Sequence, residues 1–305
     1  MALEADQAVD RRRLKRRLST WRIATVVAVV ALAFVALARY RSVVSPLVAP
    51  PHVARLRVDG VITEDPERIK ALREVARDTR VRALLVDIDS PGGTVVGSEE
   101  LFRALRRVAA KKPVVAVMGT VAASGGYMTA LGADHILARQ GTITGSIGVL
   151  MQTADITGLL GKVGIKPEAI KSAPLKAVPS PFEPLTDEGR AATRAVVMDM
   201  YDVFVGMVAD RRGLDIEQAK KLADGRIFTG RQAVALKLVD EIGGDEEARS
   251  WLESAHGVPA TLPVRDVEIK HESSGLLGLV GGSIGKALFS ERLTLDGLVA
   301  LWHPN

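Results

Sequence analysis

The sequence predicts an α/β protein whose mostly parallel sheet is built from strands joined by crossover helices. Short apolar runs rich in branched residues alternate with amphipathic segments of about a dozen residues, which is the pattern of strands joined by helices. Glycine-rich turns follow two of these runs directly, at the strand ends where such folds collect functional loops. With 305 residues, 47% of them hydrophobic and 25% charged, the chain can bury at least one full core.

The first predicted strand covers residues 53–62, where apolar and polar positions alternate in VARLRV. Residues 66–77 begin with a proline and are amphipathic, so we expect a helix there. The branched, apolar run over residues 81–88 (VRALLVDI) predicts a second strand, which leads directly into Ser90-Pro91-Gly92-Gly93. Together these segments predict the first strand, helix and strand unit of the sheet.

A second helix is expected over residues 99–110 and a third strand over residues 114–118. This strand is a short apolar run (VVAVM) of the kind that parallel sheets bury on both faces. It leads into the small-residue stretch AASGG at residues 122–126, and we expect a helix to begin within residues 127–131.

Residues 135–137 predict a further strand, and residues 141–148 a loop whose glycines are too irregular for a nucleotide-binding fingerprint. Residues 186–212 predict one long amphipathic helix, with Thr186 as its N-cap and Gly213 after its last turn. We interpret its apolar stripe as core, and a contact between subunits is the alternative. The stripe consists of Val196, Val197, Met200, Val203, Phe204 and Met207. Short helices are expected over residues 215–223 and 230–238.

Ser124 is the candidate nucleophile, because small residues surround a single hydroxyl at the end of a strand. Its neighbours Ala123, Gly125 and Gly126 leave room for a substrate. If a helix begins just after the serine, backbone amides and the positive end of the helix dipole face any anion that forms there. The alternative is an ordinary N-cap serine in a tight turn between strand and helix.

The pair Gly92-Gly93 follows the neighbouring predicted strand. Adjacent glycines usually mark a turn and nothing more. Beside a nucleophile, however, a glycine amide that no side chain shields can hold the oxyanion of an acyl-transfer intermediate. We therefore assign the candidate oxyanion hole to the amides of Gly93 and Gly125.

A serine hydroxyl needs a base that takes its proton. None of the five histidines has a favourable setting; they are His52, His135, His256, His271 and His303. We interpret His135 as a surface or strand-edge residue, because a helix separates it from Ser124. A lysine is the other option, if desolvation lowers its pKa from ~10.4 towards ~7 to 8. The proline-rich stretch after Ile165 offers three candidates, and their spacing does not choose among Lys166, Lys171 and Lys176.

The amino-terminal residues 1–22 are basic, and we expect them in the cytoplasm. The apolar run that follows predicts a single transmembrane anchor over residues 23–39, which would place the remainder outside the cytoplasm; a cleaved signal peptide is the alternative. Residues 40–52, rich in proline, are interpreted as a linker.

The net charge of +5 comes from seven basic residues of the amino-terminal segment 1–22, so nucleic-acid binding is not expected. The absence of cysteine excludes disulfides and thiolate catalysis.

Six short motifs follow one another along the middle of the chain. They are Asp89-Ser90-Pro91-Gly92-Gly93, Ala122-Ala123-Ser124-Gly125-Gly126-Tyr127, Thr144-Gly145-Ser146-Ile147-Gly148, Ile170-Lys171-Ser172 with Lys176, Ser180-Pro181-Phe182, and Ala223-Asp224-Gly225-Arg226 with Thr229-Gly230-Arg231-Gln232-Ala233. Together they resemble the bacterial signal peptide peptidase A family, and the similarity extends over residues 53–244.

This resemblance implies a Clp-protease and crotonase-like fold, a ring-like homo-oligomer and a catalytic dyad of serine and lysine. The family's functional positions fall on Ser124 as nucleophile, Lys176 as general base, Gly93 and Gly125 as oxyanion glycines, and Ser146 as the hydroxyl that helps orient the lysine. One departure is that Ala177 follows Lys176 where many family members have aspartate.

The implied substrates are extended peptides, in particular the signal peptides left in the membrane after secretion. We expect a peptidase domain over residues 53–270, followed by a tail over residues 271–305, and a mechanism without cofactor or metal. Two other functions remain open at this stage. A crotonase-like enzyme could act on acyl thioesters with the same fold, and a catalytically inactive chain could serve as a scaffold.

Overall fold

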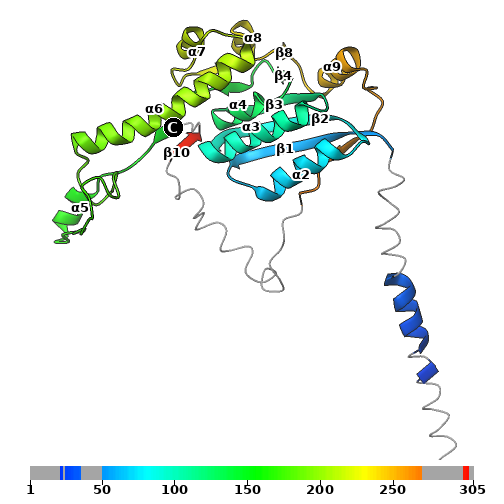
Figure 1. Ribbon diagram of the computed structural model, residues 1–305, viewed down its shortest axis with the longest axis horizontal. Helices are drawn as coiled ribbons and strands as arrows, with labels where there is room; N and C mark the ends of the chain where they lie inside the picture. The colour runs from blue at the N-terminus through cyan, green and yellow to red at the C-terminus, as the bar shows by residue number, and fades with distance from the viewer. Residues whose placement is uncertain (1–20, 23–24, 36–49, 270–297, 302–305) are drawn as a thin grey trace, which may run out of the picture. The chain divides into compact units, whose positions relative to one another are not determined.

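The computed structural model describes residues 21–22, 25–35, 50–269 and 298–301 (Figure 1). The chain divides into two units, residues 1–50 and residues 51–305. In the first unit, residues 21–22 and 25–35 are helical and exposed. No helix within the described ranges has both the length and the apolar character that crossing a bilayer requires. The predicted anchor over residues 23–39 includes positions 23–24 and 36–39, which lie outside the described residues.

The second unit contains most of the described helices and strands. In chain order they are β1 (His52–Ile62), α2 (Pro66–Arg77), β2 (Val81–Thr94), α3 (Val95–Ala109), β3 (Val114–Ala123), α4 (Gly125–Ala130), β4 (His135–Ala138), β5 (Ile143–Gly145), β6 (Leu150–Met151), α5 (Thr157–Lys162), α6 (Asp187–Arg212), α7 (Ile216–Leu222), β7 (Ile227–Thr229), α8 (Gly230–Ala235), β8 (Glu241–Ile242), α9 (Asp245–His256), β9 (Val264–Asp266) and β10 (Leu298–Leu301).

The sheet is mostly parallel, as the sequence predicts. β2 pairs in parallel with β1 on one side and with β3 on the other, and β3 continues the parallel order to β4 and β8. β5 pairs in parallel with the far end of β3. Antiparallel pairs join β5 to β7, and β10 to both β2 and β6. The prediction of a mixed α/β fold with crossover helices is therefore confirmed.

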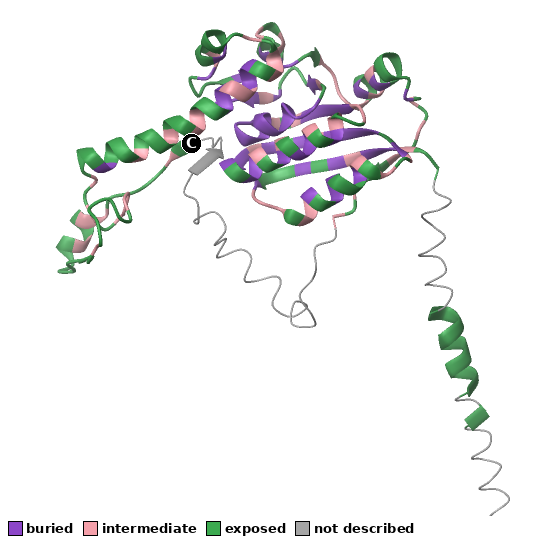
Figure 2. Ribbon diagram, viewed as in Figure 1, coloured by how far each residue is buried: buried purple, intermediate pink, exposed green. Residues whose placement is uncertain are grey.

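Both faces of the sheet are covered, which explains why its strands are almost continuously apolar. On β2, Leu84 and Val86 belong to the core formed with α2, α3, α4 and the second half of α6. The alternate residues Ala83 and Leu85 belong to a second core, which includes Leu252 of α9. Figure 2 shows the buried residues concentrated in these strands and in the helix faces beside them.

Two strands continue further than their apolar runs indicate. β2 extends through the Ser90-Pro91-Gly92-Gly93 turn, because Val61 and Ile62 of β1 pair with Gly92 and Gly93. β3 extends to Ala123, because β5 pairs with its last residues. Pairing with strands that are distant in the sequence thus outweighs the poor strand propensity of glycine. The helix predicted over residues 99–110 begins earlier, at Val95, where Thr94 caps it by accepting from the amide of Gly97.

The long helix α6 has the predicted limits: the Thr186 side chain accepts from the amide of Gly189, and Gly213 ends the helix with a φ of 61°. Our interpretation of its apolar stripe as core holds only for its second half. There Phe204 is fully buried, although its neighbour Val203 is 43% exposed, and in the first half Val196 is 45% exposed. In the first half, the helix leaves the sheet and has no core to pack against (Figure 1).

The first half of α6 forms one projecting segment with the residues before it, which we call the arm (residues 152–200). No residue of its short helix α5 is buried. The amide of Ile156 donates to the carbonyl of Pro181, which ties the beginning of the arm to the proline-rich stretch. Large apolar side chains are exposed along the arm: Leu159, Val163, Ile165, Ile170, Leu175, Phe182, Val196 and Met198. So much exposed apolar surface is typical of a site that binds another protein.

Candidate active site

Ser124 occupies the turn between β3 and α4 in an unusual backbone conformation. Its φ of 54° and ψ of −119° lie outside the regions that non-glycine residues normally adopt. Such a conformation costs about 1–3 kcal/mol and persists only where the surroundings enforce it. Here the amide of Ser124 donates to the carbonyl of Gly145 at 2.8 Å, and its carbonyl accepts from the amide of Met128 at 2.9 Å.

The Ser124 hydroxyl does not cap the helix that follows it. The residue stands at the N-cap position of α4, but its side chain makes no capping hydrogen bond. The alternative of an ordinary N-cap serine is therefore wrong for the side chain. Ser124 is 2% exposed and is surrounded by small residues, as the sequence indicates. A hydroxyl without a capping role is available for chemistry.

Gly125 and Gly126 form the first turn of α4, where backbone amides have no partner within the helix. Gly126 also permits a close approach between elements: a Cβ at this position would lie 2.6 Å from the carbonyl oxygen of Ser90. Only glycine fits, so the helix start is held directly against β2. The helix therefore begins at Gly125, two residues earlier than the sequence indicated.

Gly93 lies at the end of β2, on the strand next to Ser124. The pairing of Ser90 with Ala122 brings the two strand ends together. A Cβ on Gly93 would lie 1.8 Å from the carbonyl oxygen of Ile62, so the backbone of β1 excludes any side chain here. The structure thus brings Gly93 and Gly125 to the same end of the sheet as Ser124.

Ser90 is a supporting residue that the sequence analysis did not single out. It is fully buried, and its hydroxyl donates to the carbonyl of Gly60 at 2.6 Å. The same oxygen accepts from the amide of Gly92 at 3.1 Å, and Gly92 has a φ of 106°. Ser90 therefore fixes the turn that carries Gly93. Its position inside the SPGG motif could have pointed to Ser90 from the sequence, but its partner Gly60 is thirty residues away along the chain.

Ser146 follows β5 with a positive φ of 48°. Its amide donates to the carbonyl of Arg226 at 2.8 Å, which joins this loop to the segment before β7. The hydroxyl of Thr144 donates to the carbonyl of Ala122 at 2.7 Å and so holds β5 against the end of β3. Ser146 is half-buried, one residue beyond the glycine that binds the Ser124 amide.

The three candidate lysines all lie on the arm. Lys166 and Lys176 are exposed, and Lys171 forms an ion pair with Glu183. The Lys176 amide donates to the carbonyl of Ala173 at 3.1 Å in a turn, and the next residue, Ala177, has a positive φ of 63°. Within one chain, the arm that carries these lysines projects away from the sheet (Figure 1).

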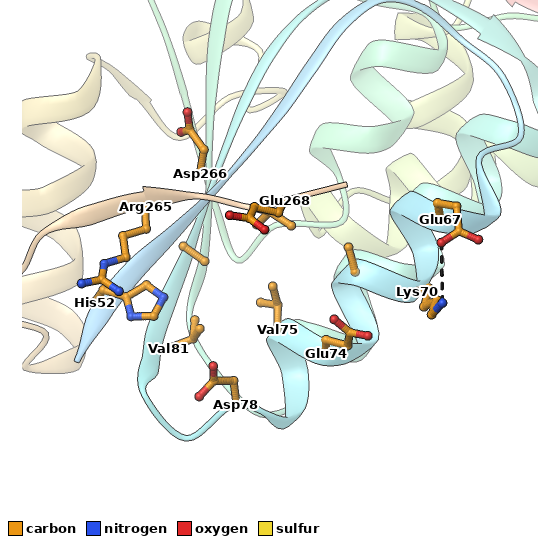
Figure 3. Close-up of a pocket in the computed structure, with 13 residues that line it drawn as sticks. His52, Glu67, Lys70, Glu74, Val75, Asp78, Val81, Arg265, Asp266 and Glu268 are labelled. Carbon is orange, nitrogen blue, oxygen red and sulfur yellow. Dashed lines mark ion pairs between the residues drawn. The ribbon is translucent and has the colours of Figure 1, made fainter. Parts of the chain in front are cut away.

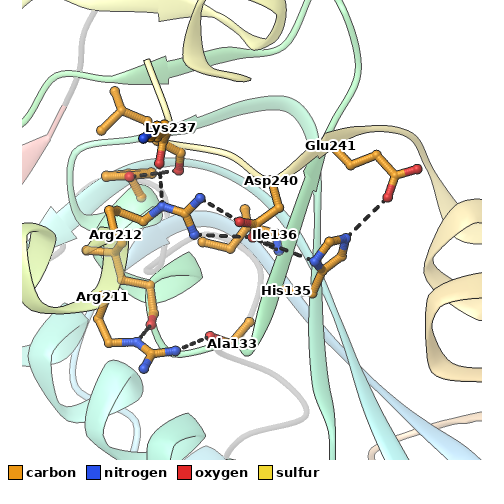
Figure 4. Close-up of polar contacts among 11 residues, drawn as sticks. Ala133, His135, Ile136, Arg211, Arg212, Lys237, Asp240 and Glu241 are labelled. Atoms are coloured by element: carbon orange, nitrogen blue, oxygen red, sulfur yellow. Dashed lines mark hydrogen bonds and ion pairs between the residues drawn. The ribbon is translucent and has the colours of Figure 1, made fainter. Parts of the chain in front are cut away.

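His135 lies at the wrong end of the sheet to assist Ser124. It pairs with Val115, nine positions before Ser124 on the adjacent strand, which is on the order of 30 Å away at the rise of a strand. Its ring stacks on Trp251 with centroids 4.7 Å apart, and its Nε2 lies 3.3 Å from Glu241 (Figure 4). The prediction of a strand-edge residue is confirmed for His135.

The other histidines do not change this conclusion. His52 begins β1 and pairs with Val81 at the same end of the sheet as His135. His256 ends α9 and meets the edge of Trp251. His271 and His303 lie outside the described residues.

The structure contains a cavity of about 410 Å³ (Figure 3). It is lined by the first residues of β1 and β2, by α2 and by residues after β9, including His52, Glu74, Asp78 and Glu268. Arg80 binds the carboxylate of Asp78, and this hydrogen bond lowers the pKa of Asp78 to about 2. Because the strands are parallel, this cavity is at their opposite end from the candidate site.

The family model described as Peptidase family S49 matches residues 106–259. A putative protease from Synechocystis is 44% identical to this chain over 208 residues, covering 68% of this chain and 75% of that protein. A putative protease from Methanocaldococcus jannaschii is 38% identical over 240 residues, covering 76% of each chain. A putative signal peptide peptidase SppA from Enterococcus faecium is 33% identical over 268 residues, covering 82% of this chain and 76% of that protein.

Proposed function

Because the chain belongs to peptidase family S49 and is a serine-type peptidase, we propose that Ser124 is its nucleophile and that the amides of Gly93 and Gly125 form the oxyanion hole. The observation that carries this proposal is the backbone of Ser124. Ser124 lies in a strained turn at the carboxyl end of β3, beside the first turn of α4. Its hydroxyl makes no capping hydrogen bond to that helix. We also propose the Clp-protease and crotonase-like fold that the motif resemblance implies, and the mostly parallel sheet agrees with it.

The proposed reaction uses only side-chain and backbone groups of the protein. A neutral amine takes the proton of the Ser124 hydroxyl while the oxygen attacks the carbonyl carbon of a peptide bond. The amides of Gly93 and Gly125 donate to the oxygen that becomes negative. The protonated amine then gives its proton to the departing amino group, and a water molecule, activated by the same amine, hydrolyses the acyl-enzyme.

We assign the base to Lys176. Lys171 is less suitable because Glu183 already binds it. Lys176 has no such partner among the described residues, and the motif resemblance favours it. A lysine acts as a base only where it is desolvated, and Lys176 is exposed in the single chain. We therefore propose that a second copy of the chain covers the arm and brings Lys176 and a hydroxyl such as that of Ser146 into one site.

The proposed substrates are extended peptides with small or apolar side chains, such as signal peptides that remain in the membrane after secretion. The surroundings of Ser124 support this choice, since AASGGYM and TITGSIGVL contain no charged residue. An anchor over residues 23–39 would hold the enzyme beside such substrates on the outer face of the membrane, with residues 1–22 in the cytoplasm.

The test is covalent labelling of the full chain with a fluorophosphonate, followed by mass spectrometry of the labelled peptide. We expect the adduct on Ser124, with no adduct in Ser124→Ala. Lys176→Ala should slow labelling by at least about 100-fold, because general-base assistance contributes that much. Lys166→Ala is the matched control on the same arm, and His135→Ala is the control for a histidine base; both should label at the rate of the unmodified protein.

Three outcomes would contradict parts of this proposal. Labelling that is unchanged in Lys176→Ala removes the lysine from its assigned role. Labelling of another serine removes Ser124. No labelling at all, together with no cleavage of a peptide library, favours the scaffold alternative, and hydrolysis of an acyl thioester without peptide cleavage favours the crotonase-like alternative.

A further inference from the structure

A groove of about 420 Å³ lies between helices α2 and α3, which pack side by side against the sheet (Figure 1). Its apolar floor comes from Leu72 and Ala76 of α2 and from Ala104 of α3, and Ala110 lines it just after α3 ends. The remaining lining residues are all cations: Arg73, Arg77, Arg107 and Lys111. The groove therefore combines an apolar floor with a positively charged rim.

The four cations of the rim have no anionic partner among the described residues. All four side chains are exposed, and none of them forms an ion pair or a side-chain hydrogen bond within the described part of the chain. The adjacent Arg106, in contrast, binds the carboxylate of Asp134 at 2.9 Å. The positive charge of the rim is thus left without compensation inside the protein.

The ends of the two helices account for only half of this charge. Arg77 lies in the last turn of α2 and Arg107 in the last turn of α3, where a cation interacts favourably with the helix dipole. Arg73 lies one turn before the end of α2, and Lys111 follows the end of α3. Each is four residues from the cation at its own helix end, and like charges at this spacing repel each other. An anion bound in the groove would remove the repulsion.

An anionic phospholipid matches both the rim and the floor. Its phosphate diester suits guanidinium groups, because arginine binds two phosphate oxygens at once. The glycerol and the first methylene groups of its acyl chains can then cover the apolar floor. A free phosphate ion or an acidic peptide would bind the rim but leave the floor exposed to water.

The groove also lies where the chain enters the domain. α2 leads into the start of β2 and α3 into the start of β3, so both helices end at the amino ends of the strands. β1 begins at the same end, because His52 pairs with Val81. Residues 40–51 separate β1 from the anchor proposed over residues 23–39, and a stretch of that length spans at most ~40 Å. Such an anchor would keep this end of the domain within reach of a bilayer surface.

We propose that the groove between α2 and α3 binds the headgroup of an anionic phospholipid. Arg73 and Arg77 contact the phosphate from one side of the groove, and Arg107 and Lys111 contact it from the other. Ala76, between the two arginines of α2, packs against the glycerol. This site is separate from the candidate active site, and the proposal does not depend on Ser124 as the nucleophile.

The test measures binding of dihexanoyl-phosphatidylglycerol to the full chain in nonionic detergent by isothermal titration calorimetry. Arg73→Gln/Arg107→Gln removes one cation from each helix, and we expect it to weaken binding at least about tenfold. Ala110→Glu, which adds a carboxylate beside the cations, should weaken binding as much. Lys221→Gln/Arg231→Gln is the matched control, because it removes two exposed cations elsewhere; it should bind like the unmodified chain.

Dihexanoyl-phosphatidylcholine, which has no net charge, measures partition of the lipid into detergent and should give the same weak signal with every form. Both groove variants should keep or raise the melting temperature, because each reduces the repulsion among the cations. If Arg73→Gln/Arg107→Gln does not fold, the result with Ala110→Glu decides.

Three results would overturn the proposal. The first is equal binding of phosphatidylglycerol to the unmodified chain and a folded groove variant, or equal binding of the two lipids to the unmodified chain. The second is displacement of the lipid by an equal concentration of inorganic phosphate or hexaglutamate, which would indicate a general anion site. The third is a smaller assembly of the groove variants in light scattering, which would make the groove an interface between copies.

Fluorophosphonate labelling separates this proposal from the proposed function. All forms should label Ser124 at the same rate in detergent, because the groove cations lie towards the amino ends of the strands and Ser124 follows the carboxyl end of β3. Absence of labelling in every form overturns the proposed function, while the calorimetry still decides whether the groove binds the lipid.

Discussion

The backbone amide of Ser124 donates to the carbonyl oxygen of Gly145 at 2.8 Å, and this bond joins the end of β3 to the end of β5. Both residues have positive φ angles, 54° for Ser124 and 81° for Gly145. The turn that carries Ser124 is therefore enforced by a second turn from a different part of the chain.

Replacement of Gly145 tests this coupling. A Cβ at Gly145 would lie 2.6 Å from Cδ2 of Phe228, in a backbone conformation that side chains rarely adopt. We expect Gly145→Ala to lower the free energy of unfolding by about 1–3 kcal/mol and to slow fluorophosphonate labelling of Ser124. Chemical denaturation and labelling kinetics measure the two effects. Gly141→Ala is the matched control, because a Cβ there meets open space. If the two variants lost the same stability and the same labelling rate, the Gly145 turn would not be what enforces the Ser124 turn.

Ser90 provides a second test, because its hydroxyl supports the turn that carries Gly93. In Ser90→Ala, the amide of Gly92 and the carbonyl of Gly60 lose their partner, which we expect to cost about 1–3 kcal/mol of stability. The labelling rate should fall as well, because the Gly93 amide is less well positioned. Ser98→Ala is the control: Ser98 is equally buried, but its hydroxyl has no hydrogen-bond partner among the described residues, so its loss should change stability by less than about 0.5 kcal/mol.

Tyr127 anchors the helix that begins after the serine. Its hydroxyl donates to the carbonyl of Leu238 at 2.8 Å in the core, and burial raises the pKa of the phenol. We expect Tyr127→Phe to destabilise the protein by about 1–2 kcal/mol, because the buried carbonyl loses its donor. Tyr201→Phe removes a half-buried hydroxyl instead and should be nearly neutral in the same thermal unfolding measurement. An unchanged melting temperature in Tyr127→Phe would show that this hydrogen bond contributes little to stability.

The arm tests the proposal that a second copy completes the site. Leu159 and Val163 are 62% and 63% exposed, so replacing both by serine should leave the melting temperature of the single chain unchanged. If the arm is an interface, the double variant should form smaller assemblies in light scattering and label more slowly, because Lys176 is no longer covered. Ile216→Ser, at a 46% exposed position on α7, should change neither. Unchanged assembly size in the double variant would exclude this face as the interface.

Asp78 gives a pH dependence of stability. Arg80 holds its pKa at about 2, below the ordinary value of 3.8, so the ionised form favours the folded protein. This stabilisation is fully present above about pH 4 and is lost as the pH falls towards 2. Since the pair is close to the surface, its contribution is at most about 1 kcal/mol. The difference in unfolding free energy between the unmodified protein and Asp78→Asn should therefore shrink as the pH falls from 4 through 2; a difference that stays constant over this range would have another cause.

Local signals were sufficient wherever a few neighbouring residues decide the structure. The helix Pro66–Arg77 has the predicted limits, because a first-turn proline and an apolar stripe define it. Thr186 and Gly213 likewise define α6. The turn between β3 and α4 that contains Ser124 was predicted for the same reason, since a turn that demands small residues requires them at adjacent positions.

What the sequence alone determined is the mixed α/β class, the chain order of the main strands and helices, and the family to which the chain belongs. The tertiary structure alone decided that β2 and β3 continue past their apolar runs, that Ser90 reaches Gly60, and that half of α6 is exposed. It also decided that residues 298–301 lie beside Gly93. The physical reason is that each of these features depends on a partner far away in the sequence, and local propensity carries no information about such a partner.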